Sequence, residues 1–213
     1  EVVLASEFRY CDPIIDSRTL VVVISQSGET LDTMAALREA KSLGARILSI
    51  VNVVGSSIAR ESDDVLYTWA GPEIAVATTK AYSTQMAVLD LLAIYLAGQR
   101  KTITAEDMRR LTSAIAALPA QVEQILSNRE QIQYYASQYF NHDSVFFIGR
   151  NLDYALGMEG SLKLKEISYI HSEAYASGEL KHGTISLIEP GTLVVALGSY
   201  TPLFDKAMSN VIE

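Results

Sequence analysis

The sequence has little cysteine, no long apolar run and no cluster of basic residues. The single cysteine among 213 residues, Cys11, cannot form an internal disulfide, which is typical of a reducing cytoplasm. No apolar run reaches the ~18 residues that span a bilayer, so we expect no membrane partner. A net charge of −8 without a Lys/Arg cluster argues against nucleic acid as a partner.

Motifs for nucleotides and metals are missing as well. The sequence has neither the Gly-x4-Gly-Lys-Ser/Thr pattern of a P-loop nor the Gly-x-Gly-x-x-Gly pattern of a dinucleotide fold. No spacing of His, Cys or Asp is typical of a metal site. We therefore expect no metal and no cofactor. The residues present, 49% hydrophobic and 20% charged, suffice for one large or two small α/β domains.

An apolar run followed at once by a helical pattern is the most informative stretch of the chain. Residues 20–24, Leu-Val-Val-Val-Ile, predict a strand of a parallel sheet that is buried on both faces. Residues 31–43 have apolar side chains at helical spacing, and Gly44 ends that pattern. A strand–loop–helix unit presents free backbone N–H groups and the positive end of the helix dipole to an anion.

The loop of this unit is rich in hydroxyl groups. Ser25, Ser27 and Thr30 add hydrogen-bond donors, and Gly28 lets a ligand approach the backbone closely. These residues predict a site for a small phosphorylated metabolite. The alternative from the spacing alone is a structural turn in which a hydroxyl serves as an ordinary helix N-cap.

Strand and helix patterns alternate along the first hundred residues. We expect strands at 2–5, 20–25, 46–51 and 65–67, and helices at 31–43 and 80–96. This alternation predicts βαβ units with right-handed crossovers.

A stretch without strand patterns, residues 105–140, comes next. Its apolar residues recur every three or four positions, which predicts helices, and Pro119 is expected to kink or break them. The α/β rhythm then resumes with a strand at 145–150, a helix at 153–167 and a strand at 192–197. The predicted regions are a first lobe at 1–100, linking helices at 101–140 and a second lobe at 141–213.

The two lobes can be laid over each other in sequence. Residues 20–25 align with 193–198, and Asp32 then meets Asp205. The first lobe has Ser-Gly-Glu-Thr at 27–30 where the second has Tyr-Thr-Pro-Leu at 200–203. The second copy thus lacks the hydroxyl-rich loop, and we expect phosphate binding in the first lobe.

Three segments resemble a known family. The loop at 25–30 is similar to that of the sugar isomerase (SIS) family. Residues 71–82 resemble the second ligand-contacting loop of one subfamily, the isomerizing glutamine–fructose-6-phosphate aminotransferases, and residues 159–183 resemble its catalytic helix and loop. The resemblance implies two doubly wound, flavodoxin-like α/β lobes. It also implies that both lobes are incomplete here and that the glutaminase domain and the carboxy-terminal tail are absent.

The same resemblance implies binding of fructose 6-phosphate or glucosamine 6-phosphate and isomerisation of the ketose to the aldose. It assigns sugar and phosphate contacts to two loops, with Ser25, Gln26, Ser27 and Thr30 in the first and Val76 and Thr78 in the second. It implies a homodimer, because a histidine of one subunit reaches the site of the other. For the 213-residue chain alone we expect weak or no turnover.

Catalytic roles in the second lobe also follow from the resemblance. Glu166 would move a proton between C1 and C2, Lys163 would stabilise the enediolate, and His182 would open the sugar ring. The pattern alone allows a surface ion pair for Lys163 and Glu166 and a solvated loop residue for His182.

Two other functions fit the same lobes. One is a fructosamine-phosphate deglycase, and the other is a module that senses phosphosugars without catalysis. Glu166 and His182 favour an enzyme, whereas a sensor needs only the loop at 25–30.

Overall fold

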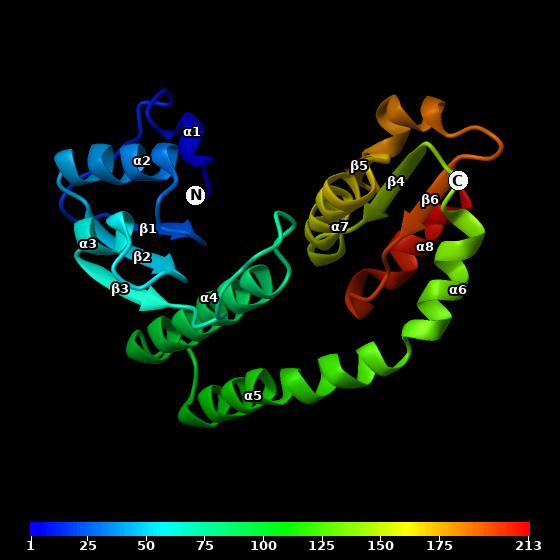
Figure 1. Cartoon of the computed structure of the whole chain (residues 1–213). Helices are drawn as coiled ribbons and strands as arrows, with labels where there is room; N and C mark the ends of the chain where they lie inside the picture. Colours follow the sequence, from blue (N-terminus) through cyan, green and yellow to red (C-terminus); the bar gives the residue numbers. More distant parts are fainter. The chain divides into compact units, whose positions relative to one another are not determined.

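The computed structural model describes residues 1–213 and divides into two compact units (Figure 1). Unit 1 comprises Glu1–Ala120, and unit 2 comprises Gln121–Glu213. Each unit contains a three-stranded parallel sheet with helices in its crossovers, which confirms the predicted α/β class.

Unit 1 has its strands in chain order. The sheet order is β1-β2-β3, with β1 at Leu20–Ser25, β2 at Arg46–Val51 and β3 at Asp64–Tyr67. The helices are α1 (Ala5–Phe8), α2 (Leu31–Ser42), α3 (Ser57–Glu61) and α4 (Lys80–Gln99). Because all strands are parallel, the loop from β1 to α2 leaves the carboxyl edge of the sheet, where α/β proteins bind ligands.

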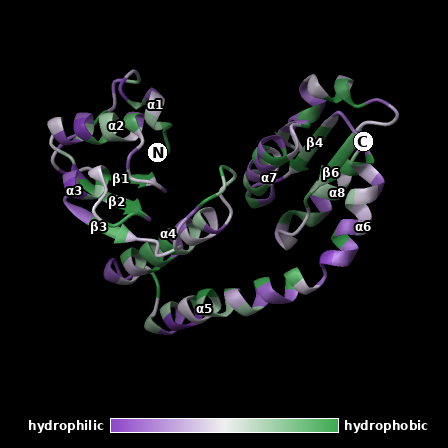
Figure 2. Ribbon diagram, in the orientation of Figure 1, coloured by the Kyte–Doolittle hydropathy of each residue, from purple (hydrophilic) through white to green (hydrophobic).

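One face of this sheet packs against α2 and α3. Leu37 of α2 and Ile58 of α3 are fully buried with Ile47 and Val51 of β2. Figure 2 shows the apolar colour concentrated on β2. Burial of a leucine or isoleucine side chain contributes roughly 1.5–3 kcal/mol, so this packing holds α2 firmly against the sheet.

β1 is only half buried, which corrects the expectation of burial on both faces. Val23 is 6% exposed, whereas Leu20 and Ile24 are 45% and 41% exposed. Successive side chains of a strand point to opposite faces, and β1 is an edge strand of this sheet. The strand expected at residues 2–5 is also wrong, because four residues without a neighbouring strand have no ladder to join, and Ala5 instead begins α1.

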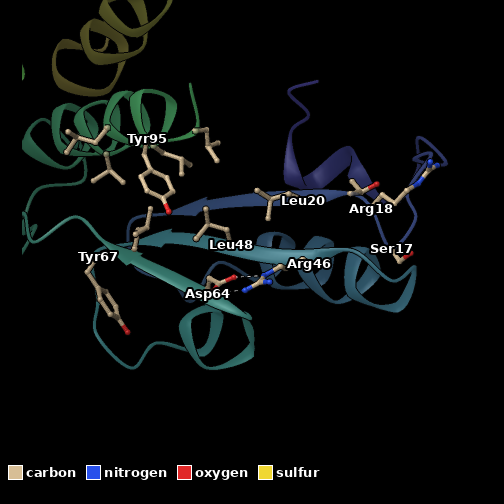
Figure 3. Close-up of a pocket in the computed structure, with 14 residues that line it drawn as sticks. Ser17, Arg18, Leu20, Arg46, Leu48, Asp64, Tyr67 and Tyr95 are labelled. Atoms are coloured by element: carbon tan, nitrogen blue, oxygen red, sulfur yellow. Dashed lines mark hydrogen bonds and ion pairs between the residues drawn. The ribbon is translucent and has the colours of Figure 1, made fainter. Parts of the chain in front are cut away.

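A cavity of about 960 Å³ lies between α4 and the sheet (Figure 3). Leu20 and Leu48 line it from the strands, and Tyr95 points into it from α4. The ion pair of Arg46 with Asp64 also lines it. None of the predicted site residues is among its lining residues.

Two long helices follow α4, as the apolar spacing predicts. They are α5 (Ala105–Ser127) and α6 (Arg129–Tyr139). Pro119 lies inside α5, so a break at this residue is not observed, and the helices are instead separated at Asn128. A proline removes one hydrogen bond of the helix, and the remaining turns of this 23-residue helix keep it continuous.

Unit 2 has the sheet order β5-β4-β6. Its strands are β4 (Ser144–Gly149), β5 (His171–Ala176) and β6 (Leu193–Ala196), and its helices are α7 (Leu152–Ser168) and α8 (Phe204–Ile212), with 3-10 turns η1 (Leu180–His182), η2 (Thr184–Leu187) and η3 (Thr201–Leu203). β5 was not predicted, since its sequence His-Ser-Glu-Ala-Tyr-Ala contains no apolar run. None of the helices in either unit is long and apolar enough to cross a membrane.

Candidate functional site

The loop from β1 to α2 is organised by the hydroxyl of Ser25. This side chain is 7% exposed, and its Oγ accepts the N–H of Gly28 at 3.1 Å. The same oxygen lies 3.2 Å from Oγ1 of Thr30. The Ser27 hydroxyl accepts the N–H of Glu29 at 3.2 Å. Three hydroxyls are therefore gathered at the amino-terminal end of α2.

Backbone donors at this end of α2 are left without acceptors. The N–H groups of Ser27, Thr30 and Leu31 make no hydrogen bond within the chain. Because α2 has 12 residues, its dipole adds positive potential where these groups lie. Free amides, hydroxyls and the dipole together form a site suited to an oxyanion such as a phosphate ester.

Gly28 is required by the tight packing of this loop on the loop that precedes α3. Its φ is 67°, and a Cβ added to it would lie 2.0 Å from Oγ of Ser56. The carbonyl of Gly28 accepts the N–H of Ile58 at 3.0 Å. Neither a side chain nor the usual backbone conformation of other residues fits here.

Glu29 also connects the loop to the start of α3. Its carboxylate accepts the N–H of Ser57 at 2.8 Å, which lowers the pKa of Glu29. This contact was not predicted from the sequence. The only sequence feature that indicates the contact is the preference of an acidic side chain for the start of a helix. The helix start that Glu29 binds, at Ser57, lies 28 residues further along the chain.

The second predicted contact loop precedes α4. Val76 is 93% exposed and Thr78 is partly buried. Neither residue hydrogen bonds to the loop of Ser25–Thr30, so the structure does not join these two sets. Lys80 begins α4, as expected, and donates to the carbonyl of Pro72 at 2.6 Å.

In unit 2, α7 presents a cation between two carboxylates. Lys163 Nζ lies 3.6 Å from Oε1 of Glu159 and forms a close hydrogen bond with Oε2 of Glu166. The three side chains are 19%, 21% and 28% exposed, respectively, so this is a partly buried cluster rather than a freely solvated pair. Glu166 first, and then the charge of Glu159, raise the pKa of Lys163, which keeps it protonated.

Glu159 is a member of this cluster that was not predicted from the sequence. It lies four residues before Lys163, and the i,i+4 spacing of opposite charges on a helix was the available signal. A carboxylate beside a held ammonium can accept a proton, while the ammonium stabilises an oxygen that becomes negative.

His182 ends η1 on an exposed loop of unit 2. Its backbone N–H donates to the carbonyl of Glu179 at 3.0 Å. Its imidazole forms no hydrogen bond or ion pair within the chain, so the structure does not join it to Lys163 or Glu166. The residue is exposed on this loop.

Comparisons with known proteins extend over the whole chain. The SIS domain family matches residues 1–95 and 138–210. All 213 residues align with the glutamine–fructose-6-phosphate aminotransferases (isomerizing) of Clostridium acetobutylicum, at 57% identity, and Caldanaerobacter subterraneus, at 58%. A solved structure, the C-terminal domain of glucosamine-fructose-6-phosphate aminotransferase from Francisella tularensis, has a TM-score of 0.96 and 40% identity.

These matches cover the whole of this chain but only part of each relative. The chain is covered completely, yet it spans 35% of the length of those two curated relatives and 60% of the solved chain. Both sheets lie within the residues that the family matches. The chain therefore belongs to the SIS domain family.

Proposed function

We propose that this chain is the phosphosugar-isomerising part of an isomerizing glutamine–fructose-6-phosphate aminotransferase. It would bind fructose 6-phosphate and convert the ketose to the aldose. Family membership and the 57% identity over 213 residues support this proposal. Amination with glutamine would require chain outside these residues, since the match covers 35% of the relative's length.

The observation that carries the proposal is the set of unused donors at the start of α2. The amides of Ser27, Thr30 and Leu31 lack acceptors, and three hydroxyls lie beside them. A phosphate ester brings several acceptor oxygens and negative charge, which match these donors in number and sign.

The second part of the proposal concerns the proton transfer. The Glu166 carboxylate would take a proton from C1 of the open-chain ketose and return it to C2. The Lys163 ammonium would stabilise the enediolate oxygen formed in between, an effect typically worth about 3 kcal/mol in the transition state. The His182 imidazole would protonate the ring oxygen as the ring opens.

The exposed position of His182 supports a shared site. Because its imidazole has no partner within the chain, we propose that it acts in the site of a second copy, in a homodimer. The single cysteine, Cys11, is free and exposed, which supports a reducing, cytoplasmic setting.

Two substitutions test the binding and the chemistry separately. Thr30→Val removes one hydroxyl at constant shape and is expected to weaken fructose 6-phosphate binding by about tenfold or more, because a hydrogen bond to a charged group is worth roughly 1.5–3 kcal/mol. Glu166→Gln is expected to preserve binding and to abolish formation of glucose 6-phosphate. Calorimetry measures the binding, and a coupled assay on a longer protein that carries this chain measures the turnover.

The control is Thr112→Val, which removes a hydroxyl that bonds only within α5. Unchanged binding in Thr30→Val would contradict the phosphate site. Unchanged turnover in Glu166→Gln would contradict the assigned base. Binding without turnover in the unsubstituted protein would favour the sensing module over the enzyme.

A further inference from the structure

Unit 2 contains a buried carboxylate that has no cation as partner. Asp153 lies in the first turn of α7 and is 3% exposed. Its carboxylate accepts the hydroxyl of Ser199 and, at 3.1 Å, the backbone N–H of Tyr200. It takes part in none of the ion pairs of the chain, and the ion pairs on α7 are those of Lys163. Burial of a lone carboxylate is costly unless it is well hydrogen bonded, so this arrangement calls for an explanation.

The two groups that bind Asp153 belong to the loop between β6 and η3. This loop is the sequence counterpart of the β1–α2 loop, because alignment of residues 20–25 with 193–198 places Tyr200 on Ser27. The N–H of Ser27 has no acceptor in unit 1. The corresponding N–H of Tyr200 donates to the Asp153 carboxylate. The backbone N–H at this aligned position thus has no acceptor in unit 1 and donates to a carboxylate in unit 2.

The remaining positions of the unit 2 loop differ as the alignment predicts. Pro202 stands where unit 1 has Glu29 and has no N–H to donate. Leu203 stands where unit 1 has Thr30 and has no hydroxyl. Of the donors that this loop retains, the Ser199 hydroxyl and the Tyr200 N–H both donate to Asp153.

The fold brings Asp153 to this loop by a close approach of α7 to β4. A Cβ added to Gly149, the last residue of β4, would lie 2.6 Å from the carbonyl carbon of Asp153. β4 and β6 are neighbours in the sheet, so the carboxylate bridges two adjacent strand ends. The hydrogen bond from Ser199 is the main influence that lowers the pKa of Asp153, which keeps the carboxylate ionised at neutral pH.

We propose that Asp153 is a built-in anion, which occupies in unit 2 the position that a bound phosphate takes in unit 1. This inference rests on the proposed phosphate site of unit 1. It has two consequences. The chain binds one phosphate ester and not two, and the carboxylate ties the first turn of α7 to the loop after β6.

Removal of the carboxylate is expected to create a phosphate site in unit 2. We would titrate inorganic phosphate into the wild-type chain and into Asp153→Ala and follow backbone amide signals by nuclear magnetic resonance. In the wild type, the amide signals of Ser27 and Thr30 should shift and that of Tyr200 should not. In Asp153→Ala, the Tyr200 signal should shift too, with saturation at millimolar phosphate. In Asp153→Asn, where an isosteric amide still fills the position, it should stay unchanged.

The outcomes separate this inference from the proposed function. A silent Ser27 in the wild type contradicts the unit 1 site. A responsive Ser27 together with a silent Tyr200 in Asp153→Ala contradicts the built-in anion. If Asp153→Ala folds poorly, Asp153→Ser serves as the second variant, and circular dichroism in phosphate against chloride at equal ionic strength measures rescue. Absence of any specific effect of phosphate on both variants overturns the inference.

Discussion

Gly28 occupies the tightest point of the loop between β1 and α2. Its backbone has a positive φ of 67°, and the hydroxyl of Ser56 lies where a Cβ would be placed. Because Gly28 has no side chain, the backbone of the loop can lie close both to α3 and to the proposed ligand. At the scale of single residues, the shape of the proposed phosphate site depends on the absence of this one side chain.

Gly28→Ala is expected to lower the free energy of unfolding by at least ~2 kcal/mol, because strain at positive φ adds to a steric clash. Gly55→Ala is the matched control, since Gly55 has a φ of 72° and no atom within 4 Å of its added Cβ. There we expect only the conformational cost of about 1 kcal/mol. Urea unfolding followed by fluorescence of Trp69, in unit 1, measures both. Equal effects would contradict the close contact with Ser56.

At the scale of elements, α7 carries the charged cluster on one face. Glu159, Lys163 and Glu166 are spaced by four and three residues, so their side chains meet although no other element contributes to the cluster. This grouping could be predicted from spacing, as it was for the pair of Lys163 and Glu166. The partial burial of these side chains could not be predicted in this way, because it depends on neighbouring residues that the spacing does not reveal.

Glu159→Gln is expected to lower the pKa of Lys163, since the charge of Glu159 is among the influences that raise it. A pH titration of the Lys163 side-chain carbon signals would measure the change. Glu123→Gln, on exposed α5, serves as the control and should leave the titration of Lys163 unaltered. A Lys163 titration that is the same in Glu159→Gln and wild type would show that Glu166 alone holds the ammonium.

β5 shows where element prediction failed. Its sequence alternates polar and small residues, and it lies within residues 159–183, the segment that resembles a catalytic helix and loop. It nevertheless pairs along its whole length with β4. Pairing with the apolar strand β4 decides its conformation, so the deciding feature lies in the partner strand and not in the segment itself.

At the scale of the whole molecule, acid is expected to destabilise unit 1. The amide of Ile47 and the ammonium of Lys41 lower the pKa of Asp63, and Arg38 lowers that of Glu61. A carboxylate whose pKa is lower in the folded state stabilises that state above its unfolded pKa, and this contribution is lost as the pH falls. The free energy of unfolding should therefore decrease from about pH 5 to about pH 3.

Urea titrations at several pH values, read by circular dichroism and by Trp69 fluorescence, measure this dependence. Asp63→Asn should flatten the profile, because it removes one of the groups that must be protonated. Lys163 in unit 2 has the opposite dependence on pH, because its pKa is raised in the folded state. Its contribution to the free energy of unfolding is therefore lost as the pH rises through the alkaline range. A profile that is flat over the acidic range would contradict the assigned hydrogen bonds.

The amino-acid sequence is enough to predict the alternation of strands and helices, the hydroxyl-rich loop of unit 1 and the pairing of Lys163 with Glu166. These features depend on local periodicity and on residues a few positions apart. Tertiary structure decided the exposure of one face of β1, the existence of β5 and the partners of Glu29 and Asp153. Asp153 meets Ser199 from 46 residues away, and such contacts arise only when strand order brings distant loops to one edge of a sheet.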